Sequence, residues 1–370
     1  LDGQNHTLTV PEGGLPLLGY VKDAYVGNLN IYGPQIEGYG LVNNLEGVGL
    51  SGNAITIEGV TLKSGTKTLK SGLVGTYITT NSFAGCSGNF LVTIRNCVAE
   101  SGVAIGYDGT ESKIGSFAGR INGIIEGCKS YATVYGVDSV GGIVGNQDNS
   151  MTTFKVTDCE FHGTVEASGE EAGGIIGSGY IGGWADNAMR PNISHCTVTG
   201  SISGSNKVGG IQGGDSVVIQ TYARTPNEMT GNTFRGNLYS EGEAVGAIVG
   251  YYRGLNVYDN VHDNTCESDD TGLRPIGQVA YVDTNAAEHE TVYGLTYFDS
   301  SSGTFPTVSG YRGWQKNLNR TDDPLGKDSG IICTMKSGTM DPDVDTRLVG
   351  GKSTTLKAVD ANGNPIPKNN

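Results

Sequence analysis

The chain has few charged residues, a shortage of basic ones in particular, and no apolar run long enough to cross a membrane. Asp, Glu, Lys and Arg make up 17% of its 370 residues, against about a quarter in an average protein. The 38 acidic residues outnumber the 24 basic ones, which gives a net charge of −14. Nucleic acid and anionic membrane surfaces repel such a chain. We therefore expect no nucleic-acid partner and no direct membrane insertion.

The sequence also lacks the ligand spacings of common metal sites. It has seven cysteines, but no two of them form the Cys-x-x-Cys pair of a zinc site. A zinc peptidase needs a His-Glu-x-x-His helix, and the nearest string is His289-Glu290-Thr291-Val292-Tyr293, where tyrosine replaces the second histidine. We therefore expect no metal, no cofactor and no zinc peptidase activity on this chain.

Helical patterning of useful length is missing as well. Glycine accounts for 60 of the 370 residues, which is about twice its usual share. Apolar residues recur at a spacing of two rather than three to four, as they do in short strands. The composition therefore predicts an all-β chain.

A repeat is the main feature that the sequence does contain. Gly-Gly-Ile-Val-Gly at 141–145 returns as Gly-Gly-Ile-Ile-Gly at 173–177, as Gly-Gly-Ile-Gln-Gly at 209–213 and as Gly-Ala-Ile-Val-Gly at 246–250. Self-similarity at a period of roughly 30 to 40 residues indicates one supersecondary unit stacked on copies of itself. Upstream of these signatures, strand-like runs end in a cysteine, at Cys97, Cys128, Cys159 and Cys196.

The alternation of apolar residues slips by one just before each cysteine, so the backbone must bend there to keep them pointing inward. Asn96, Gly127 and Asp158 occupy this position, and all three types tolerate the left-handed conformation of a sharp bend. Short strands joined by bends, without helices, predict a right-handed parallel β-helix of about eight to ten coils over residues 1–285. The four cysteines would form an internal ladder that Cys266 could extend.

From residue 286 the repeat breaks down. We expect residues 286–370 to form an irregular C-terminal cap and tail, from which a following domain could continue. Such a cap would cover the unpaired backbone groups at the end of the last coil.

The repeats resemble a known family. Gly72-Leu73-Val74-Gly75 matches the GLUG motif, Gly-Leu-hydrophobic-Gly, and the later glycine signatures are variants with isoleucine in second place. The opening segment, from Leu1 to Leu8, is similar to the Leu-Asp-Gly-x-Gly-His-Thr-Ile coil that often starts such arrays. The resemblance covers residues 1–285. It implies a secreted or cell-surface bacterial protein, similar to adhesins and to the non-catalytic β-helix region of immunoglobulin A protease-like proteins.

The segments between each glycine signature and the next strand differ most from coil to coil. Because they occupy the same place in every coil, they should project from one edge of the rod. Their aromatic and charged residues suit a sugar ring or a protein hot spot. The candidate ligand-binding residues are Tyr180, Trp184, Asp186, Arg190, Tyr222, Arg224, Tyr251, Tyr252 and Arg253. Alternatively, these aromatics cover the small cores of their own loops.

We therefore expect a non-catalytic module that binds a host glycan or glycoprotein through this loop edge. The alternative is a carbohydrate-active enzyme, a polysaccharide lyase or glycoside hydrolase, on the same scaffold. Such an enzyme needs two or three carboxylates that converge on one coil face. The loop acids Asp148, Asp186, Asp215 and Glu228 are instead scattered at one per coil. The ligand and the oligomeric state do not follow from the sequence.

Overall fold

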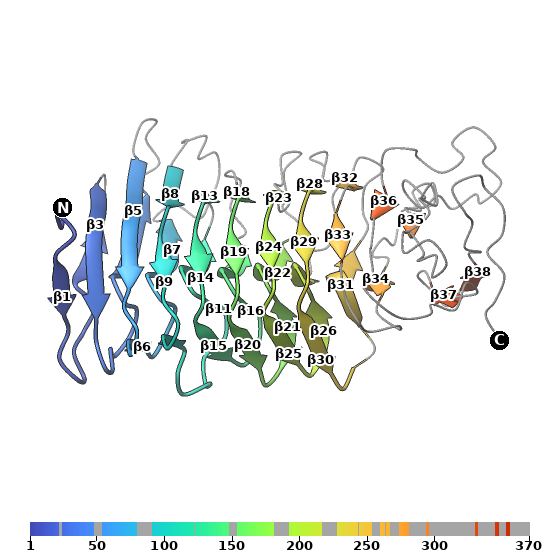
Figure 1. Cartoon of the computed structure of the whole chain (residues 1–370), viewed down its shortest axis with the longest axis horizontal. Coiled ribbons are helices and arrows are strands. Elements are labelled where there is room, and N and C mark those ends of the chain that lie inside the picture. Colours follow the sequence, from blue (N-terminus) through green and yellow to red (C-terminus); the bar gives the residue numbers. More distant parts are fainter. Residues whose placement is uncertain are drawn as a thin grey trace.

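Strands lie side by side along one axis in the computed structural model, and they build a rod with the N-terminus at one end (Figure 1). The structure describes residues 1–21, 24–47, 54–79, 91–121, 123–147, 154–180, 192–216, 228–242, 244–253, 260–262, 264–266 and 274–280, and four short strands beyond them. All regular elements in these ranges are strands, so the described part of the chain is all-β. It contains no helix that could span a membrane.

Three large parallel sheets form the rod, and we call them sheets A, B and C. Sheet A has two ladders that the long strand β5 (Ala54–Leu62) joins. The first ladder continues from β5 through β8 (Leu91–Arg95), β13 (Gly123–Glu126), β18 (Phe154–Thr157), β23 (Asn192–Ser194), β28 (Glu228–Thr230) and β32 (Asn260–His262). The second continues through β9 (Val98–Ala99), β14 (Lys129–Ser130), β19 (Glu160–Phe161), β24 (Thr197–Val198), β29 (Thr233–Phe234) and β33 (Thr265–Cys266). On its other side, β5 pairs with β3 (Tyr25–Tyr32), which pairs with β1 (Thr7–Thr9).

Sheet B is a single ladder. It comprises β6 (Lys67–Thr68), β10 (Ala104–Ile105), β15 (Thr133–Gly136), β20 (Thr164–Ala167), β25 (Ser201–Gly204) and β30 (Asn237–Ser240).

Sheet C again has two ladders, which the long strand β31 (Val245–Arg253) joins. One comprises β11 (Ile114–Gly115), β16 (Val140–Gly141), β21 (Glu170–Gly173) and β26 (Asn206–Gly209). The other comprises β2 (Leu18–Val21), β4 (Val42–Gly47), β7 (Val74–Thr79), β12 (Ala118–Ile121), β17 (Val144–Gln147), β22 (Ile176–Tyr180) and β27 (Gln212–Ser216), and β34 (Arg274–Ala280) pairs with β31. Beyond the rod, β35 (Gly294–Leu295) pairs with β36 (Gly330–Ile331), and β37 (Asp345–Arg347) with β38 (Ser353–Thr355).

One coil passes through all three sheets, which confirms the predicted parallel β-helix. Strands β13 to β17, for example, belong in turn to sheets A, A, B, C and C. This coil therefore consists of five short strands, because bends divide its passage through sheets A and C. The number of coils and the right-handed sense remain predictions. The boundary at 285 and nearly all of the expected cap lie outside the described residues.

The bends within sheet A confirm the expected left-handed positions. Asn96, Gly127 and Asp158 have φ values of 53°, 60° and 54°. The equivalent residues in the other coils also have positive φ, and they are Asn28, Gly59, His195 and Gly231. The bend turns only its own residue outward and thereby keeps the flanking apolar side chains in the interior.

The glycine signature is explained by close packing between neighbouring coils. A Cβ atom on Gly141 would lie 1.9 Å from the carbonyl oxygen of Val144, inside the turn between the two strands of sheet C. A Cβ atom on Gly142 would lie 2.1 Å from the carbonyl oxygen of Gly174 in the next coil and 2.5 Å from the Phe161 ring. No side chain fits at either position, which accounts for the repetition of the paired glycines.

The four ladder cysteines are buried and free of disulfides. Burial, the largest influence, raises the pKa of the Cys128 and Cys196 thiols well above the ordinary value.

Asn232 and Asn264 continue this ladder. The Oδ1 atom of Asn232 accepts the N–H of Cys196 at 2.9 Å, and that of Asn264 accepts the N–H of Asn232 at 3.0 Å. Cys266 instead lies opposite Phe234, which stands two residues after the ladder position of Asn232. The expectation that Cys266 extends the ladder is therefore wrong.

Candidate functional site

The strands of sheet C end in a row where the variable segments begin. The register pairs Asn146 with Ser178, Ser178 with Gly214 and Gly214 with Tyr251. The strands of sheet A on which these segments end are aligned in the same way, with Asn192 opposite Glu228. Each variable segment therefore leaves and rejoins the rod at one corner, which we call the C/A corner.

Two further segments, 48–53 and 80–90, also connect sheet C to sheet A at this corner. These two segments were not among the variable segments predicted from the sequence.

Four of the nine candidate residues lie in strands rather than in projecting loops. Tyr180 is the last residue of β22 and pairs with Ser216. Tyr251, Tyr252 and Arg253 complete β31 and pair with β34. The strands run past the glycine signature because the neighbouring coil offers a parallel partner for each extra residue.

The other five candidates are outside the described residues. They are Trp184, Asp186, Arg190, Tyr222 and Arg224. Whether any of the nine residues binds a ligand stays a prediction.

A second row of residues with left-handed backbone conformation lies in and beside the first strands of sheet C. Lys113, Ser139, Glu171 and Lys207 have φ values between 54° and 67°. The side chains of Glu171 and Lys207 lie beside Gly214, since a Cβ atom on Gly214 would meet them at 3.2 and 3.3 Å.

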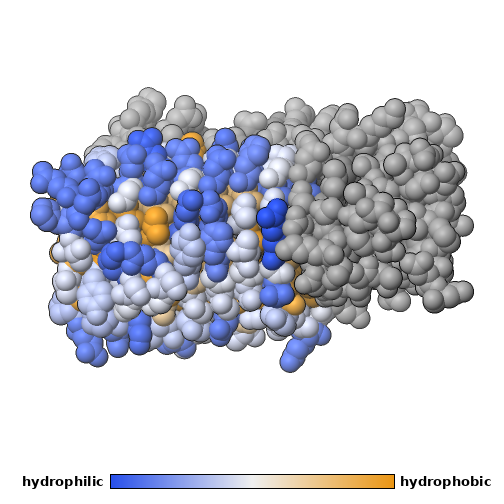
Figure 2. Space-filling view, in the orientation of Figure 1, coloured by the Kyte–Doolittle hydropathy of each residue, from blue (hydrophilic) through white to orange (hydrophobic). Residues whose placement is uncertain are grey.

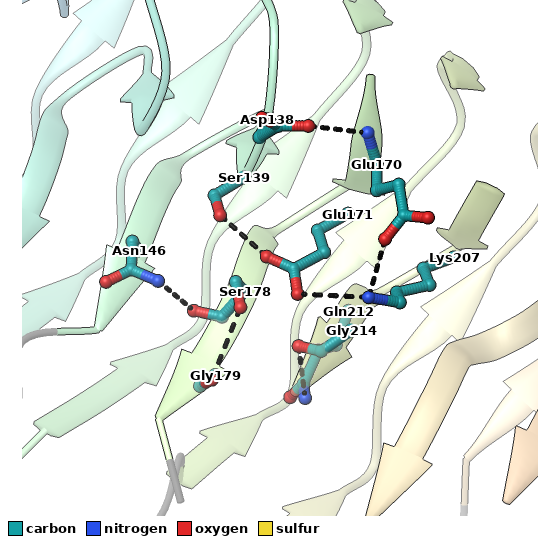
Figure 3. Close-up of polar contacts among 10 residues, drawn as sticks. All are labelled: Asp138, Ser139, Asn146, Glu170, Glu171, Ser178, Gly179, Lys207, Gln212 and Gly214. Carbon is teal, nitrogen blue, oxygen red and sulfur yellow. Dashed lines mark hydrogen bonds and ion pairs between the residues drawn. The ribbon is translucent and has the colours of Figure 1, made fainter. Parts of the chain in front are cut away.

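The centre of this row is the Lys207 network, formed by Lys207, Glu170, Glu171, Ser139 and Asp138 (Figure 3). The Nζ atom of Lys207 lies 2.6 Å from Glu170 Oε2 and 3.7 Å from Glu171 Oε1. Ser139 Oγ donates to the other oxygen of Glu171 at 2.7 Å, and the Glu170 N–H donates to Asp138 Oδ1 at 2.8 Å. The network thus links three successive coils through charge-assisted hydrogen bonds.

Tyr251 connects this network to the C/A corner. The ammonium group of Lys207 lies 5.2 Å from the centroid of the half-buried Tyr251 ring, within range of a cation–π interaction. Beneath the network, Asn146 Nδ2 donates to the carbonyl of Ser178, and Gln212 Nε2 donates to that of Gly214 at 3.1 Å (Figure 3). Both side chains, Asn146 and Gln212, are buried.

The Lys207 network contains three carboxyl groups, of Asp138, Glu170 and Glu171, and Lys207 forms ion pairs with two of them. The hydrogen bond from Lys207 lowers the pKa of Glu170. Burial acts to lower the pKa of Lys207, but its ion pairs with Glu170 and Glu171 outweigh burial and raise it. A general acid in a glycosidase needs a raised carboxyl pKa. The lowered pKa of Glu170 is therefore the opposite of what a general acid requires.

A second polar cluster lies on the outer face of sheet A. His162 Nε2 lies 2.9 Å from Glu160 Oε2, and His162 Nδ1 lies 2.7 Å from Thr199 Oγ1. The Tyr131 ring stacks on His162 with 4.9 Å between centroids, and Lys129 forms an ion pair with Glu160 at 2.8 Å. His162 therefore belongs to the wall of the β-helix.

Sequence reasoning missed both clusters. A signal for the first was present, since Ser139, Glu171 and Lys207 each stand two residues before a glycine signature. Within the ranges that the structure describes, no group of three or more His, Cys, Asp or Glu side chains could hold a metal ion.

Comparison with known proteins found no matching family model, no similar curated protein and no similar solved structure.

Proposed function

We propose that this chain is a non-catalytic binding module of a secreted or cell-surface bacterial protein, and that it binds a host glycan or glycoprotein at the C/A corner. The bacterial surface location rests on the resemblance to GLUG-repeat adhesins and immunoglobulin A protease-like proteins. The binding role rests on the alignment of the variable segments.

The observation that carries the proposal is the shared register of the strands that support these segments. Ser178, Gly214 and Tyr251 lie in one row, so side chains of successive segments start about 4.8 Å apart on a rigid support. A repeated scaffold with varied insertions along one edge is the usual design of a solenoid binding surface. The Lys207–Tyr251 contact lies beside this row and adds an aromatic and a cationic group.

The test is a glycan and mucin array probed with the purified chain, followed by affinity measurements on variants. Trp184→Ala and Tyr222→Ala should each weaken binding at least about tenfold, because stacked aromatics contribute a kcal/mol or more at a hot spot. Tyr239→Ala is the matched control, since this tyrosine is 59% exposed on sheet B, away from the corner.

Two results would count against the proposal. One is an array without any bound ligand, and the other is an equal loss of affinity in the Tyr239 variant. The enzyme alternative is tested in parallel by the release of reducing ends or unsaturated products from any glycan that binds. Turnover that Glu170→Gln and Glu171→Gln abolish would establish the alternative instead.

A further inference from the structure

Two rows of outward side chains run along the rod where sheet A turns into sheet B. One row continues the second ladder of sheet A, and the other belongs to sheet B. The six residues, which we call the A/B strip, are Tyr131, His162, Thr199, Thr133, Thr164 and Ser201. The residues that follow the sheet B row, Val134, Val165 and Ile202, are fully buried. Because side chains alternate along a strand, the strip faces outward.

Neighbouring side chains orient the two rings of the strip. Both ring nitrogens of His162 have a partner, Nε2 with Glu160 at 2.9 Å and Nδ1 with Thr199 at 2.7 Å. Lys129 forms an ion pair with the other oxygen of Glu160 at 2.8 Å. The Tyr131 ring stacks on the His162 imidazole, with 4.9 Å between centroids and 20° between planes. A ring that is already oriented loses little conformational entropy when a ligand packs against it.

Tyr131 remains accessible in spite of this stacking, with 42% of its surface exposed. It is one of six exposed large hydrophobic residues in the described part of the chain. On the side of the rod that Figure 2 shows, hydrophilic residues predominate and apolar residues appear only in small areas. An exposed aromatic ring is therefore an exception on this molecule.

A turn in the preceding coil bounds the strip on the side of Tyr131. Ala104 pairs with Thr133, and Glu100 lies opposite Tyr131. Glu100 and Ala104 are four positions apart, whereas Tyr131 and Thr133 are two positions apart. The extra residues include the exposed turn Ser101–Gly102. The strip itself has no such insertion in its three coils, so its two rows stay in register.

The chemistry of the strip is uncharged and rich in hydroxyl groups. Between Glu100, which forms an ion pair with Lys63, and Arg235, neither row contains Asp, Glu, Lys or Arg. Every residue of the strip except His162 carries a hydroxyl group, which can both donate and accept a hydrogen bond. The net charge of −14 repels anionic polymers. The strip therefore matches a neutral ligand that has many hydroxyl groups of its own.

We propose that the A/B strip binds a neutral oligosaccharide that lies along the axis of the rod. One sugar ring packs against Tyr131, whose ring offers an apolar surface and a polar hydroxyl. The hydroxyls of the following sugars bond to Thr164 and Ser201. Equivalent residues recur about every 4.8 Å along the rod, so successive coils meet successive units of a repeating polymer. The strip lies at a different corner of the coil from the C/A corner, and the inference does not depend on the function proposed for that corner.

The experiment is isothermal titration calorimetry of the full chain with cellohexaose, xylohexaose and mannohexaose as neutral probes and a galacturonic acid hexamer as an anionic one. We expect a neutral probe to bind and the galacturonic acid hexamer not to bind. Tyr131→Ala should weaken binding at least about tenfold. Thr164→Val removes one hydroxyl at nearly constant volume and should weaken it about threefold to tenfold. Tyr20→Ala is the control, since this tyrosine is 54% exposed on sheet C, and should leave the affinity unchanged. Circular dichroism checks that the variants fold.

Four outcomes would overturn the proposal. No neutral probe could bind, the galacturonic acid hexamer could bind as tightly as the neutral probes, or the Tyr20 control could lose as much affinity as the Tyr131 variant. In the fourth, Trp184→Ala weakens binding of the probe while Tyr131→Ala and Thr164→Val leave it unchanged. That result would place the sugar at the C/A corner, so it would support the function proposed for the corner and refute the site on the strip.

Discussion

Replacement of Asn232 by alanine should destabilise the rod locally, and more than replacement of the same residue by cysteine. The Asn232 side chain is fully buried. Its Oδ1 atom accepts the Cys196 N–H at 2.9 Å, and its Nδ2 atom donates to the carbonyl oxygen of Ile193, also at 2.9 Å, and to Asn264 Oδ1. Alanine would leave a backbone donor and a backbone acceptor without these partners in an interior that excludes water.

The expected cost follows from those two groups. Each buried polar group that loses its partner costs about 1–3 kcal/mol, and the small void left by the amide adds to this, so we expect about 3–5 kcal/mol. Asn232→Cys is the matched comparison, because cysteine occupies the same ladder position in the preceding coils. There Cys196 Sγ donates to the Val156 carbonyl at 3.7 Å. Since sulfur bonds are longer and weaker, this variant should lose only about 1–2 kcal/mol.

Denaturant unfolding and hydrogen exchange together measure the effect. Repeat arrays open locally, so the exchange of the Cys196 and Asn232 amides reports the change directly, while a global transition averages it over the rod. Faster exchange at these two amides is expected in the alanine variant, with a smaller change in the cysteine variant. An alanine variant that stays within about 1 kcal/mol of the wild type would refute the reasoning.

Three further predictions concern other parts of the rod. Gly142→Ala should lower the melting temperature by several degrees at least, because its Cβ atom would meet the Gly174 carbonyl at 2.1 Å and push two coils apart. The hydrogen bond from Lys129 lowers the pKa of Glu160, so its contribution to stability is present above the ordinary value of 4.5 and is lost as the pH falls below it. Glu160→Gln should flatten the acid limb of a stability profile. The ladder cysteines should react with a thiol reagent only on denaturation, and fast labelling of Cys128 in the native chain would contradict their burial.

The sequence by itself determined the architecture of the repeat. The glycine signatures, the spacing of two and the bend residues Asn96, Gly127 and Asp158 predict a parallel β-helix, and the structure confirms the fold and the left-handed bends. These features were readable because they depend on the local conformation of one coil. A bend with φ near +55° favours asparagine, aspartate or glycine whatever lies in the next coil, although His195 occupies the same bend in one coil.

Only the tertiary structure decided which residues of different coils meet. The variable insertions change the distance along the chain between equivalent positions, so the register of one coil on the next could not be counted from the sequence. Pairing with the neighbouring coil places Cys266 beside Phe234 rather than in the cysteine ladder. It also places Tyr251 in a strand beside Lys207 rather than in a loop. Contacts such as that between Lys207 and Glu171 arise from stacking alone, because parallel pairing of the coils sets neighbours that are more than 30 positions apart side by side.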